Sequence, residues 1–582
     1  MKKHFLFLFL FALLTGIPTH AQTDNEVVGD DAAPGITTGD NNTIVGDFAG
    51  FLLTEGSRNV FLGYQAGRAT VIRDGNIFIG MDAGFDNNTF RNTFIGHQAG
   101  RLNTTGNDNL FIGAEAGESN TQGSDNTFIG EEAGASNTTG SRNVFIGEDA
   151  GFDNTTASSN VFIGEEAGFN TTTGEGNTFI GGENAGISEP IYGDTYPVNA
   201  GGEVAAGYQN TTGNYNTYIG GGAGRDGSSA SANTFIGYAA GLNNEISSES
   251  TFVGTFTGAD NDRTGDLDDA LRNNYFGFAA GNTNRDGSDN VGIGYEADFE
   301  EIGNGNSRNS RNVFIGNNTL INRANDAVLL GYGGTINNDA DQSIGIGAQV
   351  MVSGQRSIGI GYDTDILAAA DDAVGIGHQV EVGGQFAIAL GAESVATAEN
   401  SIAIGYQANV TTANSVVIGN SATTSIGGVV NWTATSDGRY KTDVLENVVG
   451  LDFINRLRPV TYQYNALQLH QRSFPHASNL QAALTAKSQI RYSGFLAQEV
   501  ETATQSANYN FSGIDRPSDE NGIYGLRYAE FVVPLVKAAQ ELIEAIEATE
   551  VEHNDLKAKT DKMDDLEARI KRLEVANGQA NN

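Results

Sequence analysis

The chain contains no cysteine, only 8 prolines among 582 residues, and no lysine between Lys3 and Lys441. The lack of cysteine excludes disulfide bonds and thiolate metal sites. With 77 glycines, the scarcity of proline favours an array of tight turns over a disordered proline-rich chain. A net charge of -39 leaves no basic face for nucleic acid or an anionic membrane, so we expect neither as a partner. Neither a phosphate-binding loop nor a Gly-x-Ser-x-Gly elbow occurs, and we expect no cofactor.

The N-terminal segment has the pattern of a secretory signal peptide. Two lysines precede an apolar run over residues 5–14, and a small-residue exit site ends at Ala21. The apolar run is too short to span a bilayer, so we expect cleavage between Ala21 and Gln22 and removal of residues 1–21. No later apolar stretch is long enough for a transmembrane helix. The sequence therefore predicts an exported chain without a transmembrane segment.

Residues 22–431 are dominated by a short repeat. A pentamer of the form Asn-Thr/Val-Phe-Ile-Gly recurs, and a two-residue step and Ala-Gly follow each copy. Its last residue, the marker glycine, is spaced by 16 or 17 residues at Gly46, Gly63, Gly80, Gly96, Gly113, Gly130, Gly147, Gly164 and Gly181. Late in the repeats the spacing is 14 residues, at Gly377, Gly391, Gly405 and Gly419. A fixed short period with one strand-like pentamer per unit predicts a mainly β fold, a parallel β-roll or solenoid of 14–17-residue coils.

The residues before each marker glycine predict how the coils are filled. The position directly before it is aliphatic, and the position before that is aromatic where the period is long. Adjacent strand residues point to opposite faces, so both faces of such a strand are apolar and both need cover. We expect one face to line the coil interior and the other to pack against identical chains. Where the period shortens, small residues such as Gly359 and Ala403 replace the aromatic and suit a narrower coil.

Asn-Thr pairs recur at the turns between these strands. Two interpretations fit them equally well. Their side chains either form ladders that satisfy backbone groups of neighbouring coils, or they are merely soluble turn residues.

The late units SIAIG (401–405) and SVVIG (415–419) resemble the head repeats of trimeric autotransporter adhesins. The resemblance covers about residues 343–420 and is looser for the 17-residue units. It implies a left-handed parallel β-roll that forms a homotrimer. It also implies a secreted or cell-surface protein of a bacterium, with a surface glycan or protein as its ligand.

Two insertions interrupt the repeat. One lies between Gly181 and Gly220 and contains two prolines, and we expect a protruding loop there. The other is acidic and contains Asp260, Asp262, Asp266 and Asp268 at spacings that echo a calcium loop. However, Leu271 stands where the closing glutamate should be, so a solvated acidic loop is the favoured interpretation of this second insertion.

The repeat ends near residue 431, and lysine, leucine and glutamine become frequent. We expect a helix over 448–457, a strand over 460–464 and a strand leading into a helix over 492–500. From Tyr528 a long helix begins, whose apolar residues recur every three or four positions except at 549–555. This spacing predicts a coiled coil in two segments. The predicted divisions are a small α+β domain (432–530), the coiled coil (531–575) and a disordered tail (576–582).

This region resembles the intramolecular chaperone auto-processing domain of endosialidase-type phage tail spikes and of some membrane-bound transcription regulators. The motifs that carry the resemblance are Ser436-Asp437-x-Arg439-x-Lys441, Arg458-Pro459-Val460-x-Tyr462, Gly494-Phe495-x-Ala497-Gln498-Glu499, Tyr528 and Gln540-Glu541-Leu542. The resemblance implies a domain that drives trimerisation of the fold ahead of it, ends in a trimeric coiled coil and then cleaves itself off. It implies Ser436 as nucleophile, Lys441 as its base and the bond between Thr435 and Ser436 as the cleavage site. Asp437 and Arg439 match the motif and are interpreted as structural.

The spacing of the serine and the lysine is explained if the chain turns back at Asp437-Gly438. A hairpin with this two-residue turn pairs Ser436 with Arg439 and brings Lys441 to the same face. A lysine acts as a base only after losing its proton, which burial or a nearby cation favours, and Arg439 is a candidate cation. The alternative is a plain polar turn at a domain junction, with no cleavage.

The sequence thus predicts an exported homotrimeric fibre or adhesin that is an enzyme only as a single-turnover, self-cleaving serine endopeptidase. Two alternatives remain. A polysaccharide-degrading tail-spike-like enzyme would need a carboxylate pair in a groove, whereas the acids here are scattered over repeat positions, such as Glu131, Glu132, Glu165 and Glu166. The other alternative is an uncleaved, purely structural shaft.

Overall fold

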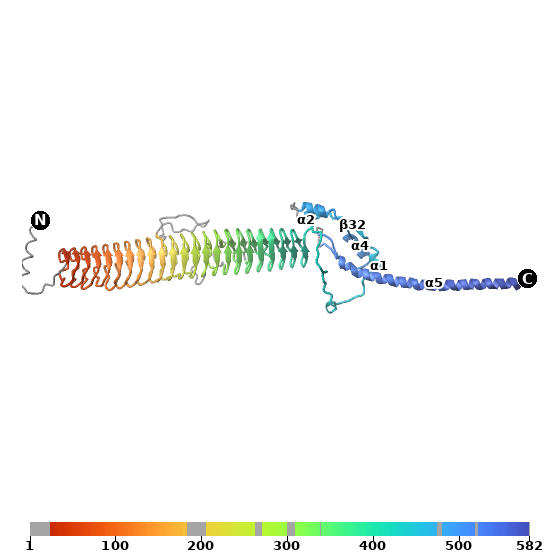
Figure 1. Cartoon of the computed structure of the whole chain (residues 1–582), viewed down its shortest axis with the longest axis horizontal. Coiled ribbons are helices and arrows are strands. Elements are labelled where there is room, and N and C mark those ends of the chain that lie inside the picture. Colours follow the sequence, from red (N-terminus) through yellow and green to blue (C-terminus); the bar gives the residue numbers. More distant parts are fainter. Residues whose placement is uncertain are drawn as a thin grey trace, which may run out of the picture. The chain divides into compact units, whose positions relative to one another are not determined.

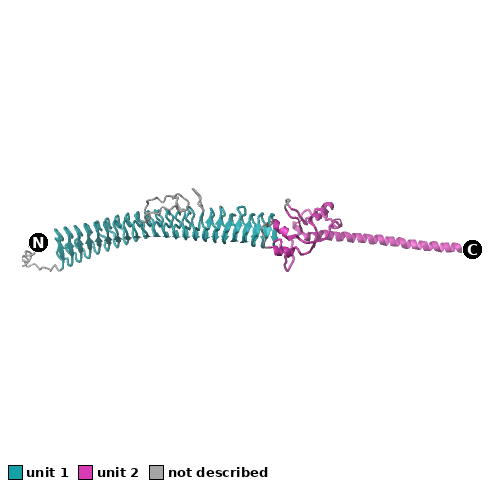
Figure 2. Cartoon of the chain, turned by 90° about the horizontal axis from the view of Figure 1, so that it is seen from above, with its two compact units in different colours: residues 1–419 teal, residues 420–582 magenta. Residues whose placement is uncertain are grey.

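In the computed structural model the chain forms two compact units, and the boundary between them lies between Gly419 and Asn420 (Figure 2). The residues that the structure describes are 24–182, 205–261, 270–299, 309–337, 339–473, 480–517 and 522–580. The first unit ends earlier than the boundary predicted at residue 431. Residues 420–431 follow the last strand of the repeats and group with the second unit.

The first unit is a parallel β-solenoid whose main sheet has 23 strands, each paired in register with the next coil (Figure 1). Its strands are β1 (Glu26–Val28), β2 (Thr43–Val45), β3 (Val60–Leu62), β4 (Ile77–Ile79), β5 (Thr93–Ile95), β6 (Leu110–Ile112), β7 (Thr127–Ile129), β8 (Val144–Ile146), β9 (Val161–Ile163), β10 (Thr178–Ile180), β11 (Thr217–Ile219), β12 (Thr234–Ile236), β13 (Thr251–Val253), β14 (Asn274–Phe276), β15 (Val291–Ile293), β17 (Val313–Ile315), β19 (Val328–Leu330), β21 (Ile344–Ile346), β23 (Ile358–Tyr362), β25 (Val374–His378), β27 (Ile388–Leu390), β29 (Ile402–Ile404) and β31 (Val416–Ile418). The predicted mainly β solenoid is confirmed.

A second parallel sheet of eight strands accompanies the shorter coils. Its strands are β16 (Asp298–Phe299), β18 (Leu320–Ile321), β20 (Thr335–Ile336), β22 (Met351–Val352), β24 (Asp365–Ile366), β26 (Glu381–Val382), β28 (Val395–Ala396) and β30 (Asn409–Val410). A Cβ atom on Gly359 would lie 3.1 Å from side-chain atoms of both Val350 and Val352. The second sheet therefore fills the space that an aromatic ring takes in the longer coils, as the small residues predict.

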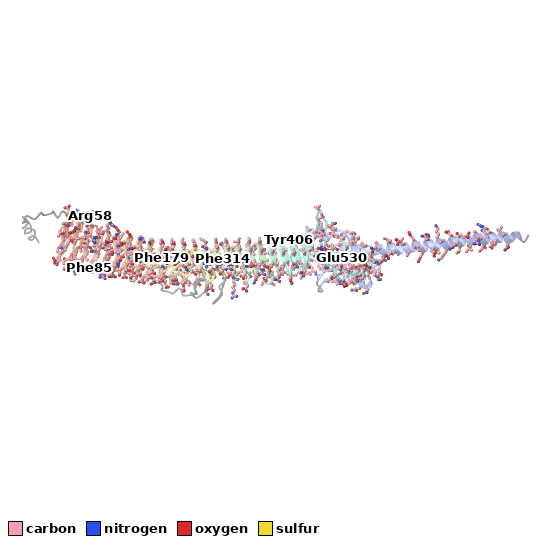
Figure 3. The ribbon with its side chains drawn as sticks, turned by 90° about the horizontal axis from the view of Figure 1, so that it is seen from below. Arg58, Phe85, Phe179, Phe314, Tyr406 and Glu530 are labelled. Atoms are coloured by element: carbon pink, nitrogen blue, oxygen red, sulfur yellow. The ribbon has the colours of Figure 1, made fainter. Side chains whose placement is uncertain are left out.

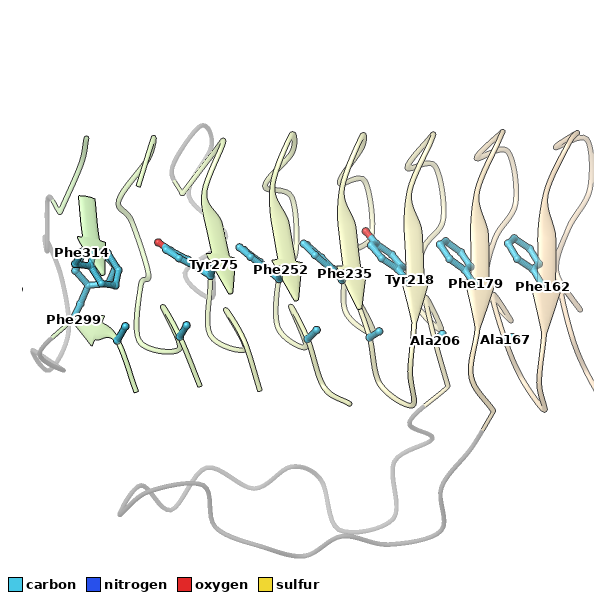
Figure 4. Packing of buried hydrophobic residues seen from close by; sticks show 14 of the residues in the cluster. Phe162, Ala167, Phe179, Ala206, Tyr218, Phe235, Phe252, Tyr275, Phe299 and Phe314 are labelled. Atoms are coloured by element: carbon cyan, nitrogen blue, oxygen red, sulfur yellow. The ribbon is translucent and has the colours of Figure 1, made fainter. Parts of the chain in front are cut away.

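Stacked aromatic rings fill the longer coils (Figure 4). From Phe61 to Tyr275, neighbouring rings lie 4.5–5.2 Å apart between centroids and are nearly parallel. All of these rings are fully buried. The Ala-Gly pair that follows each strand packs here as well, since a Cβ atom on Gly100 would lie 2.6 Å from the ring of Phe94. The interior of each coil is thus closed by one chain alone.

The marker glycines are required by the stacking of the coils. Gly113 has a φ of +145°, and a Cβ atom there would lie 2.0 Å from the carbonyl oxygen of Gly130 in the next coil. Any side chain would collide with that backbone, which explains why the glycine recurs at every period.

Asparagine ladders connect successive coils. The side-chain oxygen of Asn109 accepts a hydrogen bond from the backbone N–H of Asn126 at 3.0 Å, and the Asn126 amide donates to the carbonyl of Gly140 at 2.9 Å. Threonines add a second row, in which the Thr121 hydroxyl donates to the Thr138 carbonyl at 3.0 Å. These side chains satisfy buried backbone groups between coils, so the ladder interpretation of the Asn-Thr pairs is confirmed.

The residues on either side of each buried ring face outward. In strand β7, for example, Thr127 and Ile129 are partly exposed while Phe128 between them is buried. On the outer face of the main sheet, the residues after the rings form an aliphatic row, which we call the outer stripe, and the residues before the rings form a mixed row rich in threonine. Bidentate pairs such as Arg356 with Asp372, and the exposed ion pair of Arg58 with Asp74, join neighbouring coils. Arg58 is labelled in Figure 3.

The second unit is a small mixed α/β region followed by one long helix. Its elements are η1 (Gly438–Tyr440), α1 (Leu451–Ile454), β32 (Val460–Tyr462), α2 (Ala466–Ser473), α3 (Gln481–Lys487), β33 (Tyr492–Gly494), α4 (Ala497–Ser506), β34 (Ile514–Asp515), β35 (Gly525–Leu526), η2 (Tyr528–Phe531) and α5 (Val532–Ala580). Strands β32 and β33 pair antiparallel, as do β34 and β35. Each predicted element of this region is present.

Helix α5 runs without interruption from Val532 to Ala580, through the residues 549–555 where its apolar pattern weakens. Residues 576–580, predicted to be disordered, are therefore helical. Residues 549–555 include threonine, valine and histidine but no proline or glycine, and such residues cost a helix only fractions of a kcal/mol each. The weakened apolar pattern at 549–555 therefore changes the side chains on the helix surface and leaves the helical backbone intact.

Candidate functional site

The predicted serine and lysine lie together. Lys441 Nζ donates a hydrogen bond to Ser436 Oγ at 2.8 Å. Both side chains and the preceding Thr435 are exposed. The site thus has a hydroxyl next to the bond that precedes it and an amine within proton-transfer distance of that hydroxyl.

The backbone that brings them together is not the predicted hairpin. Residues 438–440 form the short 3-10 helix η1, and the carboxylate of Asp437 caps it by accepting a hydrogen bond from the Arg439 N–H at 2.9 Å. Aspartate caps such turns readily. This local hydrogen bond is favoured over strand pairing because neither arm of the predicted hairpin has a further strand to pair with. The turn places Ser436 and Lys441 at its two ends, with their side chains in contact.

Arg439 is not the free cation that the sequence suggested. Its guanidinium binds the Asp437 carboxylate through several hydrogen bonds, including Nε to Oδ2 at 3.0 Å. These bonds lower the pKa of Asp437 and raise that of Arg439. The pair braces the turn, which agrees with a structural role for both residues.

The domain that follows this turn has its own core, and motif residues pack near it. A buried cluster of Phe453, Val500, Phe511 and Phe531 forms its core. The Tyr528 hydroxyl accepts a hydrogen bond from the Phe495 N–H at 3.0 Å. A Cβ atom on the motif glycine at 494 would lie 2.2 Å from that hydroxyl, so no larger residue fits.

Two motif carboxylates connect the elements of the domain. Glu499 on α4 binds the guanidinium of Arg458 and has a lowered pKa because of that ion pair. Glu541 on α5 accepts a hydrogen bond from the backbone N–H of Leu451 at 2.6 Å, which caps the first turn of α1. The sequence identified Glu499 and Glu541 as members of the motif but did not predict their contacts, because their partners lie 41 and 90 residues away in the chain.

The acidic insertion gives no calcium site in the described part of the chain. Asp260 accepts a hydrogen bond from Asn243 at 2.6 Å and lies 3.9 Å from Arg285. Asp262, Asp266 and Asp268 fall outside the described residues, as do the signal peptide with Ala21 and Gln22 and most of the proline-containing insertion. Among the described residues there is no group of three side chains that could bind a metal ion.

The acids of the repeats form rows along the rod. Glu131 and Glu165 occupy one position of their coils, and Glu132 and Glu166 the next. The pKa of Glu132 is raised by burial and by neighbouring carboxylates, of which Asp149 is the foremost. Such a row of like charges differs from the opposed carboxylate pair that glycosidases use.

One partly buried carboxylate stands apart from these rows. Burial raises the pKa of Asp298 to about 7, although Thr283 donates hydrogen bonds to its Oδ1. Asp298 begins the second sheet at β16.

Comparison with known families finds a match within each of the two units. Residues 436–509 match the chaperone of endosialidase family, and residues 383–408 and 396–422 match two copies of the YadA head domain repeat. No curated protein matches the chain. Both resemblances are therefore confirmed: head repeats of the YadA type precede an endosialidase-type chaperone domain. Within the described residues, no helix has the length and apolar character needed to cross a membrane.

Proposed function

We propose that the protein is an exported homotrimeric fibre or adhesin whose C-terminal chaperone promotes trimerisation and then cleaves the bond between Thr435 and Ser436. The observation that carries the cleavage is the 2.8 Å contact between Lys441 Nζ and Ser436 Oγ directly beside that bond. The presence of both family matches in one chain supports the assembly.

The outer stripe of the rod supports a trimer. Ile236, Ile315 and Ile404 on this stripe remain 37–39% exposed in the single chain, although the coil interior is already closed. A continuous apolar row of this kind is unusual on a monomer surface and is typical of an interface. Three copies that turn their stripes toward a common axis would cover it.

Helix α5 supports the same assembly. It has 49 residues, and its apolar side chains are about half exposed along one face. The apolar residues of this face are Leu535, Leu542, Ile546, Leu556, Met563, Leu566, Ile570 and Leu573. Thr549 and His553 take core positions of the same heptads, and polar core residues commonly fix register and oligomeric state. A parallel coiled coil also brings Glu552 of one copy near Lys557 of the next.

The dyad supports one round of peptide cleavage. Once Lys441 has lost a proton, its amine takes the Ser436 hydroxyl proton, and Oγ attacks the carbonyl carbon of Thr435. The bond from that carbon to the Ser436 nitrogen breaks, the nitrogen takes the proton back from Lys441, and an ester remains. Water then hydrolyses the ester, which leaves a Thr435 carboxylate and a free Ser436 amine.

Intact mass spectrometry of the full chain tests the cleavage. The unmodified protein should yield a fragment of residues 436–582. Ser436→Ala and Lys441→Met should each slow its appearance by about 10³-fold or more, as expected for loss of a nucleophile or its base. Ser415→Ala, a partly exposed serine upstream, is the matched control and should cleave normally. An unmodified chain that stays intact, or a Ser436→Ala chain that is still cut, would contradict the mechanism.

Sedimentation of the cleaved rod tests the assembly. We expect the mass of three rods, because the outer stripe needs cover. A folded, single rod in solution would contradict the trimer, whatever the state of the cleavage site. The proposed adhesion at a bacterial surface, with a glycan or protein as ligand, rests on the likeness to YadA-type heads alone.

A further inference from the structure

The first residues after the rod are folded onto the chaperone. Residues 420–423 follow the last strand, β31, and form a hydrogen-bonded turn: Asn420 N–H donates to Thr423 Oγ1 at 2.9 Å, and Thr423 N–H donates to the Asn420 carbonyl at 3.0 Å. This turn groups with the second unit of the structure and not with the rod.

Two side chains of the helical pair α2 and α3 bind this turn. His470 Nδ1 on α2 lies 3.2 Å from Ser421 Oγ, within hydrogen-bond distance. Lys487 Nζ at the end of α3 donates to the backbone carbonyl of Thr423 at 2.8 Å. We call this pair of contacts the tail clasp.

The tail clasp is a built site and not a chance surface contact. His470 is fully buried, and burial lowers the pKa of Lys487. The Lys487 ammonium also lies 5.7 Å from the ring centre of Tyr464, which favours one position of its charge. Ser488 accepts a hydrogen bond from the Ala466 N–H at 3.2 Å and ties the start of α2 to the end of α3.

The tail clasp lies on the rod side of the proposed cleavage site. After Thr423, the chain is exposed through residues 424–435 and then reaches the bond between Thr435 and Ser436. Cleavage of that bond would leave residues 420–435 as the end of the rod fragment, while His470 and Lys487 stay in the chaperone fragment. None of the contacts of the clasp involves the bond that is cut.

We propose that the α2–α3 pair is a retention site for the rod's own C-terminal turn, so that cleavage and release of the chaperone are separate steps. The partner it fits is a short turn that offers a serine hydroxyl and, two residues later, a free backbone carbonyl. The cut rod keeps the chaperone through this turn until the clasp opens. The role of this retention rests on the proposed cleavage, but the binding of residues 420–423 to His470 and Lys487 does not depend on cleavage.

A chain that cannot cut itself tests the retention independently of the dyad. In the full-length Ser436→Ala protein, the exposed residues 427–432 are replaced by the recognition sequence of a site-specific protease, and an affinity tag is added at the C-terminus. After cutting, the rod fragment should stay on the tagged chaperone. Lys487→Met and Ser421→Ala should each speed its release about tenfold, the usual effect of losing one such hydrogen bond. Lys562→Met, an exposed lysine on α5, is the control and should release as slowly as the parent.

Two results would overturn the proposal: immediate separation of the two fragments in the parent, or equal release from the parent and both clasp variants. Ser421→Ala changes only the rod-side turn, so a folding defect of the chaperone cannot account for its effect. Failure of the unmodified chain to produce residues 436–582 would defeat the self-cleavage instead, and would leave the measured retention unchanged.

Discussion

Replacing one buried ring should weaken the rod locally and strongly. Phe128 is fully buried, and its ring stacks on Phe111 at 4.7 Å and on Phe145 at 4.8 Å. Truncation to alanine removes a large buried side chain and leaves a cavity, because the flanking coils are fixed by their own ladders. We expect Phe128→Ala to lower the local opening free energy by about 3–5 kcal/mol.

Hydrogen exchange followed by mass spectrometry measures this effect coil by coil. Solenoid stability is a sum of repeat and nearest-neighbour contributions, so exchange should rise mainly in the three coils that contain these rings. A loss of about 3–5 kcal/mol corresponds to exchange that is roughly 10²–10⁴-fold faster.

Phe90→Ala is the matched control. Phe90 is 40% exposed, and its ring lies 4.7 Å from the guanidinium of Arg73. Loss of this exposed contact should cost about 0.5–1 kcal/mol, which is less than a tenfold change in exchange. Equal effects of the two substitutions, or an increase spread evenly over all coils, would refute the reasoning that the stacked rings close each coil.

Two further predictions concern single carboxylates. The raised pKa of Asp298, about 7, means that the folded rod prefers the neutral acid, so the contribution of this group to stability is greatest below pH 4 and is lost as the pH rises through 7. Asp298→Asn should abolish this dependence and stabilise the rod at pH 8 by up to about 4 kcal/mol in thermal or urea unfolding; equal stability of both proteins at pH 8 would contradict the assignment. Glu541→Ala should destabilise the chaperone domain by about 1 kcal/mol, because the Leu451 N–H loses its acceptor. Glu544→Ala on the same helix is the control, and faster exchange at residues 450–455 in the first variant alone is the expected readout.

The sequence alone was sufficient for the architecture of the rod. The recurrence of Phe-Ile-Gly predicted both the coil and the alternation between a buried ring and an outward aliphatic residue. It was insufficient for the turn at Ser436. There the Asp437 side chain caps the backbone locally. The residue types of a short polar segment do not determine whether it forms paired strands or a turn.

Long-range contacts explain most of what was missed. Ser421 and His470 are separated by 49 residues, and neither belongs to a motif. The helical end of α5 was missed for another reason: the apolar period stops near residue 575, whereas the helix continues to Ala580.

The strict coil-to-coil register has a consequence for how such a rod can change. Thr178 of β10 pairs with Thr217 of β11 in the same register as any other two coils, although 39 residues separate them instead of 17. The extra residues between these two strands therefore leave the strand pairing unchanged. The length of the rod therefore changes only when whole coils are added or removed. Loops can be inserted between two strands without disturbing the strand pairing, so the surface of the rod and its length can vary independently.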